Sequence, residues 1–131
     1  VGASAILTFW GGNINPDDLG ATRIGYRGGI HAEQLLVDWA KDQIGRKAAT
    51  SSLFGVVINL VIFTQTPVCP DQCQPNLASG NWLTQLYTAT GTNPGEADIN
   101  FDVWEGAGDS STWVLRYSGY TNGMNITNIW W

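Results

Sequence analysis

The chain has few side chains of the kind that bind transition metals. His31 is its only histidine, and Cys69 and Cys73 are its only cysteines. Structural zinc sites almost always use four protein ligands, so one imidazole and two thiols are too few to close such a site alone. Catalytic zinc sites, however, use three protein ligands and leave a position for water. We therefore treat these three residues as one candidate set.

Basic side chains are also scarce. Six lysines and arginines stand against eleven acidic residues, giving a net charge of −5. A protein that binds duplex nucleic acid mainly by neutralising phosphates usually carries a basic face, which this composition does not favour. The longest apolar run, 53–63, is interrupted by Gly55 and Asn59. Because a membrane-spanning helix needs about 20 apolar residues, no membrane partner is expected, and no signal peptide is visible.

Apolar residues, by contrast, are plentiful. They make up 44% of the 131 residues, which are enough for one domain with its own core, so we expect a single domain over 1–131. Seven tryptophans and four tyrosines offer surfaces on which flipped or single-stranded bases could stack. Most of these rings are nevertheless expected in the core.

Hydrophobic periodicity predicts an α/β fold in which strands and helices alternate. The strands are expected at 3–10, 21–26, 56–64, 99–104 and 112–117. The helices are expected from His31 to Gly45 and from a start between Cys73 and Ser79. The run 56–64 is almost continuously apolar, which is typical of a central strand covered on both faces. The short segment 105–111 predicts that the last two strands pair as an antiparallel hairpin.

Two short motifs surround the scarce metal ligands. Glu33 follows in His31-Ala32-Glu33, and the cysteines lie in 67–73 with the sequence PVCPDQC. A histidine-x-glutamate followed by a proline-cysteine pair is the signature of zinc-dependent nucleobase deaminases. Zinc lowers the pKa of water, and a neighbouring carboxylate can move the released proton to the base. The motifs predict that His31, Cys69 and Cys73 bind zinc and that Glu33 is the catalytic residue.

With these motifs the chain resembles the cytidine deaminase-like superfamily. The segments 28–34 (GGIHAEQ) and 63–67 (FTQTP) are most similar to deaminase domains of bacterial polymorphic toxins. The resemblance implies a three-layer sandwich, in which a five-stranded mixed sheet has helices on both faces and ends in a C-terminal antiparallel hairpin. It implies Zn²⁺-dependent hydrolytic deamination of cytosine to uracil in nucleic acid, with single- or double-stranded DNA expected before RNA.

The toxin resemblance also implies a place of action and a partner. It is typical of a domain cut from a larger secreted or delivered effector that acts in the cytoplasm of a target cell, and the abrupt start of this sequence agrees with that picture. A cognate immunity protein is the partner that such a toxin implies.

The sequence departs from the family pattern at the cysteines and leaves the substrate contacts open. Val68 separates Pro67 from Cys69, and three residues separate the cysteines where two is the commonest spacing. The pocket asparagine that usually precedes the histidine motif has Asn13 and Asn15 as candidates. The residues that we expect to contact substrate are Asn13, Tyr26, Arg27, Thr64 and Gln65.

Other functions stay open on the sequence alone. The acidic composition suits a deaminase of free nucleosides or nucleotides, because a small base needs no extended phosphate-binding surface. A non-catalytic binding module is a further alternative, in which zinc only stabilises the fold or the two cysteines form a disulfide. A Cys69–His31 nucleophilic pair would leave Cys73 and Glu33 without a role.

Overall fold

The structure, a computed structural model, describes residues 2–25, 30–91, 96–106, 112–123 and 125–131. The strands in these residues are β1 (Gly2–Gly11), β2 (Asp17–Ile24), β3 (Val56–Thr64), β4 (Ala97–Gly106), β5 (Trp113–Asn122) and β6 (Asn125–Trp130). The helices are α1 (Ala32–Thr50), α2 (Cys73–Ala78) and α3 (Asn81–Ala89). None of these helices is long and apolar enough to cross a membrane.

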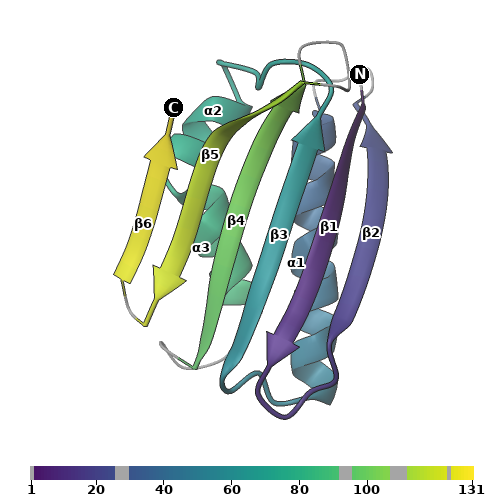
Figure 1. The fold of residues 1–131 in the computed structure, drawn as a ribbon, viewed down its shortest axis with the longest axis vertical. Coiled ribbons are helices and arrows are strands. Elements are labelled where there is room, and N and C mark those ends of the chain that lie inside the picture. The colour runs from purple at the N-terminus through teal and green to yellow at the C-terminus, as the bar shows by residue number, and fades with distance from the viewer. Residues whose placement is uncertain (1, 26–29, 92–95, 107–111, 124) are drawn as a thin grey trace.

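The strands form one mixed sheet with the order β2-β1-β3-β4-β5-β6 (Figure 1). β3 and β4 are parallel, and every other neighbouring pair is antiparallel. The predicted α/β class is confirmed, and so is the antiparallel pairing of β4 with β5. The expected number of five strands is wrong, because residues 125–130 add a sixth strand at the edge of the sheet.

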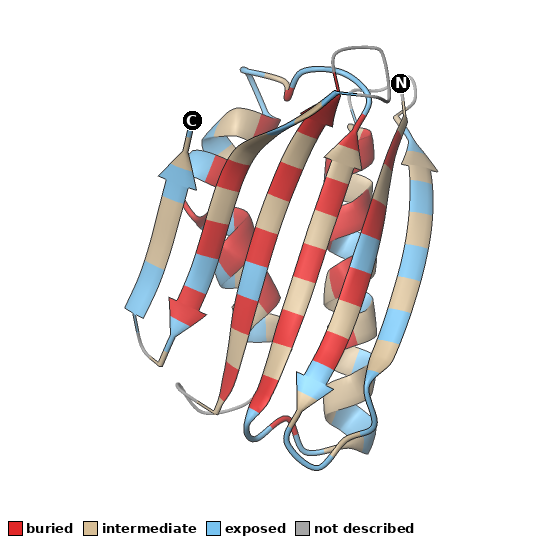
Figure 2. Ribbon diagram, viewed as in Figure 1, coloured by how far each residue is buried: buried red, intermediate tan, exposed pale blue. Residues whose placement is uncertain are grey.

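All three helices lie on one face of the sheet, behind the strands in Figure 1. Residues of β3 therefore alternate between buried and half-buried, because only every second side chain points toward the helices (Figure 2). On β1, Ile6 is 50% exposed and Trp10 59% exposed although β2 and β3 flank this strand. The expectation of helices on both faces is wrong for the described residues. A long apolar strand here marks a central position in the sheet, with only one face covered.

Helix α1 supplies much of the layer that covers the sheet. Leu36, Ala40 and Ile44 repeat every four residues and are fully buried, as expected for the apolar face of a helix. The prediction that Gly45 ends the helix is wrong, since α1 continues to Thr50. A glycine inside a helix costs only about 1 kcal/mol relative to alanine, and the last turns are held by partly buried Ala48 and by the ion pair of Lys47 with Asp17 at 2.9 Å.

The second predicted helix is divided in two at Gly80. This glycine has φ +76°, a left-handed conformation that side chains with a Cβ rarely adopt. A Cβ at this position would also approach the side chain of Asn128 in β6. Gly80 therefore lets the chain turn sharply between α2 and α3 while α2 stays against the last strand.

Candidate metal centre

The candidate ligands lie where α1 begins and β3 ends, at the same end of the sheet (Figure 1). His31 is the N-cap residue of α1, with extended backbone angles, and Glu33 is in the first turn of that helix. Thr64 is the last residue of β3, and Cys73 is the first residue of α2. The segment 65–72, which we call the cysteine loop, connects β3 to α2 and carries Cys69.

Three of these side chains form a group with the geometry of a metal site. Ligand atoms of His31, Glu33 and Cys73 all lie within 4.8 Å of one another. Donor atoms bound tetrahedrally to one zinc ion at ordinary bond lengths lie roughly 3.3–3.8 Å apart. Modest side-chain movements would therefore bring the imidazole and the thiolate onto one cation, with the Glu33 carboxylate beside it. The structure brings these three of the four predicted site residues together, and their arrangement is compatible with zinc.

The group is buried and rich in potential negative charge. Glu33 is 7% exposed and Cys73 is 1% exposed. One carboxylate oxygen of Glu33 accepts a hydrogen bond from the Thr64 hydroxyl at 2.5 Å, and the other accepts one from the Cys73 thiol at 3.7 Å. Burial, followed by repulsion from Glu33, raises the pKa of Cys73 to about 12. A divalent cation could replace the thiol proton and neutralise the thiolate and carboxylate together, so this donor set fits a metal.

Cys69 lies near this group but is not one of its three members. Its side chain is half-buried, and its carbonyl oxygen accepts a hydrogen bond from the backbone N–H of Gln74 at 2.9 Å. Its charge contributes to the raised pKa of Cys73, whereas a hydrogen bond from its backbone opposes that rise. Both thiols are free, with no disulfide between them. Cys69 stays a predicted ligand, one that would reach the group by a rotation of its side chain.

The two residues predicted to contact substrate at the end of β3 differ in their surroundings. Thr64 is completely buried, and its hydroxyl contacts Glu33. Gln65 is exposed and pairs with the start of β1, where its backbone N–H donates to the Gly2 carbonyl at 3.1 Å. The structure therefore brings Thr64 into direct contact with the predicted catalytic residue. Tyr26 and Arg27, which we also predicted to contact substrate, lie outside the described residues.

Asn13 lies far from Glu33. With Asn15 it lines a cavity of about 370 Å³ whose other walls include Lys47 and Ser51, at the C-terminal end of α1. A helix of this length extends by roughly 27 Å, and His31 and Glu33 are at its other end. The structure therefore does not bring Asn13 or Asn15 to the candidate metal centre.

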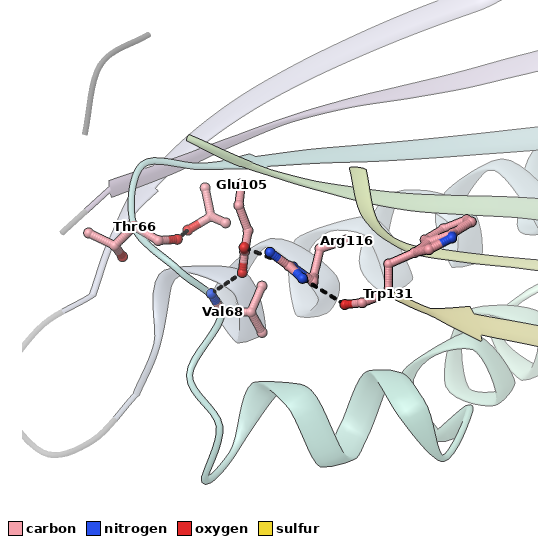
Figure 3. Close-up of polar contacts among 6 residues, drawn as sticks. Thr66, Val68, Glu105, Arg116 and Trp131 are labelled. Atoms are coloured by element: carbon pink, nitrogen blue, oxygen red, sulfur yellow. Dashed lines mark hydrogen bonds and ion pairs between the residues drawn. The ribbon is translucent and has the colours of Figure 1, made fainter. Parts of the chain in front are cut away.

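Sequence reasoning missed a second buried carboxylate beside the cysteine loop. Glu105, near the end of β4, is 8% exposed. It accepts a hydrogen bond from the backbone N–H of Val68, and Arg116 of β5 binds its other oxygen (Figure 3). One signal was available: Glu105 continues the alternation of Phe101 and Val103, which predicts a side chain facing the helices. An inward-facing carboxylate needs a partner, so the pattern already indicated a buried polar contact.

Comparison with known proteins adds no family to this description. No protein-family model matches the chain. Searches of the curated proteins and of the solved structures likewise find no match. A function for this chain must consequently be inferred from the geometry of the site and from the two motifs.

Proposed function

We propose that this chain is a zinc-dependent hydrolytic deaminase that converts cytosine to uracil in nucleic acid. The observation that carries the proposal is the grouping of His31, Glu33 and Cys73 within 4.8 Å at the junction of α1, β3 and α2. These residues come from two separate sequence motifs and meet only in the fold. A buried glutamate beside an imidazole and a thiol is the arrangement that such a reaction requires.

His31, Cys69 and Cys73 would hold the zinc ion, which leaves Glu33 free for proton transfer. Zinc, when bound, supplies a water molecule of lowered pKa and hence a nucleophile at neutral pH. Glu33 would take one proton from the attacking water as its oxygen bonds to C4, and would pass that proton to the N3 atom of the base. The proton left on the new C4 hydroxyl would then pass through Glu33 to the amino group, which leaves as ammonia when the C4–N bond breaks. The balanced reaction consumes one water and releases one ammonia. Thr64 orients the Glu33 carboxylate by its hydrogen bond at 2.5 Å.

The biological setting that we propose follows from the resemblance to polymorphic-toxin deaminases. The domain would be part of a secreted or delivered effector and would act in the cytoplasm of the target cell. Its substrate would be DNA before RNA, and a cognate immunity protein would protect the producing cell. The support for this setting is the sequence similarity of segments 28–34 and 63–67.

A second candidate, deamination of free nucleosides or nucleotides, is favoured by one specific observation. Of the six basic side chains, five are described, and four of these pair with a carboxylate. The pairs are Lys41–Asp38, Arg46–Asp42, Lys47–Asp17 and Arg116–Glu105. Cations that already have a carboxylate partner contribute less to binding a phosphate backbone, which a free nucleoside does not present.

The experiment that tests the proposal compares wild-type protein with Glu33→Ala on several cytosine substrates. Single-stranded DNA, duplex DNA, RNA and cytidine are each incubated with zinc-loaded protein, and uracil and ammonia are measured. The matched control is Asp42→Asn, which removes an exposed carboxylate from the same helix. We expect the control to keep wild-type activity and Glu33→Ala to lose it. Stoichiometric zinc without uracil from any substrate would contradict the proposal and would indicate a zinc-stabilised binding module.

A further inference from the structure

We infer that Glu105, held by Arg116, positions the cysteine loop (65–72) so that Cys69 is presented to the metal centre. The expected effect on zinc binding rests on the proposed function. The contacts that hold the loop do not, because they join residues of the chain itself. Glu105 and Arg116 come from β4 and β5, outside both sequence motifs.

The central contact joins a strand of the sheet to the backbone of the loop. The Glu105 Oε2 atom accepts a hydrogen bond from the backbone N–H of Val68 at 2.6 Å. Val68 is itself buried and directly precedes Cys69. Fixing the amide of Val68 therefore restricts where the Cα atom of Cys69 can lie, since consecutive Cα atoms are about 3.8 Å apart.

Arg116 holds the other oxygen of the same carboxylate. Its Nε atom lies 2.9 Å from Glu105 Oε1, and its Nη1 atom donates to the Trp131 carbonyl at 2.7 Å (Figure 3). The backbone N–H of Trp131 returns a hydrogen bond to the Arg116 carbonyl at 2.9 Å. Arg116 is thus bound both to Glu105 and to the backbone of Trp131. It would therefore stay with the sheet if the hydrogen bond between Glu105 and Val68 broke and the loop moved.

A β-bulge accounts for the direction of the Arg116 side chain. Val103 pairs with Tyr117 and Trp104 pairs with Leu115, so Arg116 is the extra residue between two paired positions. Bulges commonly redirect a side chain in this way. Here the redirected guanidinium meets a carboxylate on the helix-covered side of the sheet. The sheet irregularity and the loop contact therefore form one connected arrangement.

The arrangement can hold the loop because a buried carboxylate is unfavourable without partners. Glu105 has one partner on each oxygen, and moving the loop would remove one of them. The opposite end of the loop is fixed by α2, which begins at Cys73. Cys69 lies between the Val68 amide and the start of α2, which are both held in place. Contacts that orient metal ligands without touching the metal strongly affect metal affinity.

The test uses Glu105→Gln with Asp102→Asn as the matched control. Glutamine keeps the volume but has a single acceptor oxygen, so it cannot serve both Val68 and Arg116. Asp102 is three residues earlier on the same strand and accepts a hydrogen bond from the Ser118 hydroxyl at 2.6 Å, which asparagine can retain. Both substitutions remove one negative charge from β4.

Two measurements are made on each protein. The first is the alkylation rate of Cys69 in metal-free protein, resolved from that of Cys73 by peptide mass mapping. We expect Glu105→Gln to raise the Cys69 rate about tenfold or more, because a charged hydrogen bond no longer holds the loop. The second is zinc affinity by competition with a chromophoric chelator, which should fall about 10- to 100-fold. Asp102→Asn should change neither quantity.

The outcomes separate this inference from the proposed function. Wild-type protein that binds no zinc contradicts the proposed function, while the alkylation rates still decide whether Glu105 holds the loop. Unchanged Cys69 reactivity and zinc affinity in folded Glu105→Gln, or equal changes in Asp102→Asn, would overturn the inference. If Glu105→Gln does not fold, Arg116→Lys decides on the same readouts, because lysine cannot bind Glu105 and Trp131 in one fixed geometry. Failure of both variants to fold would also overturn it, since the pair would then support the sheet instead of the loop.

Discussion

Replacing Thr64 by valine should destabilise the protein although the new side chain has nearly the same shape. Thr64 is completely buried, and its hydroxyl donates to the Glu33 carboxylate at 2.5 Å. After the substitution, Glu33 keeps, among the described residues, only the longer hydrogen bond with the Cys73 thiol, at 3.7 Å. A buried carboxylate oxygen thus loses its closest donor, which is among the more costly polar changes in a protein interior.

The magnitude follows from two opposing terms. A hydrogen bond to a charged group contributes about 1.5–3 kcal/mol, and the additional buried methyl group of valine returns about 0.8 kcal/mol. We therefore expect the free energy of unfolding to fall by about 1–2 kcal/mol. For a domain of this size that corresponds to a decrease in Tm of roughly 3–6 °C.

A double-mutant cycle isolates the contact from other effects of the substitution. Thr64→Val and Thr64→Ser are each measured by urea unfolding in the wild-type and Glu33→Ala backgrounds, without metal. Valine should cost less once Glu33 is gone, because the hydroxyl then has only the Thr66 carbonyl at 3.1 Å to lose among the described residues, giving a coupling energy of about 1.5–3 kcal/mol. Serine, which keeps the hydroxyl, should show little coupling. A valine coupling energy below about 0.5 kcal/mol would refute the reasoning, because that is the scatter expected for independent sites.

Four further predictions concern the metal and the contact between β5 and the last strand. Purified protein should bind one zinc ion, and Cys73→Ala should remove that binding and the rise in Tm that zinc causes in wild-type protein, as scanning calorimetry would show. Because the pKa of Cys73 is raised to about 12 in the metal-free protein, zinc must displace the thiol proton. Zinc affinity should therefore rise by at least about tenfold per pH unit between pH 6.5 and 8.5, and more steeply where Cys69 also gives up a proton, and a pH-independent affinity would contradict thiolate binding. The Tyr117 hydroxyl donates to the Asn128 side chain at 2.6 Å, so Tyr117→Phe should lower the free energy of unfolding by about 0.5–1.5 kcal/mol. Burial also raises the pKa of Tyr117 above its usual range, so its tyrosinate absorbance should develop at higher pH than that of free tyrosine, and stability should decline once the pH exceeds the ordinary tyrosine value.

The parts of this fold that follow from local patterns were predictable from the sequence. The apolar run 56–64 indicated β3, and the short segment 105–111 indicated the pairing of β4 with β5. The last strand was missed because residues 125–130 have no clear alternation of apolar and polar side chains. The sequence also did not show that the helices cover only one face of the sheet, for a different reason. An apolar strand has the same composition whether or not a helix packs on its second face, as Ile6 demonstrates by its exposure.

The candidate site shows the same division between motif and context. His31, Glu33 and Cys73 were identified because their residue types and spacing are unusual together, and the fold brings them within 4.8 Å. Asn13 does not lie near the candidate metal centre. Its position depends on which end of the sheet the β1–β2 turn occupies, and the sequence does not show this. The contact of Arg116 with Glu105 could not be predicted, since it depends on a bulge that no local pattern marks.

The two buried carboxylates differ in how their charge is balanced, and this difference favours a cation beside Glu33 and not beside Glu105. Glu105 has Arg116 at 2.9 Å and the Val68 amide at 2.6 Å, so its charge is balanced by the protein itself. Glu33, in the part of the chain that the structure describes, contacts a neutral hydroxyl and a thiol and forms no ion pair. Burial of an uncompensated charge is strongly unfavourable. A divalent ion held by His31 and Cys73 would supply the opposite charge that Glu33 lacks, at the place where the proton transfer is proposed to occur.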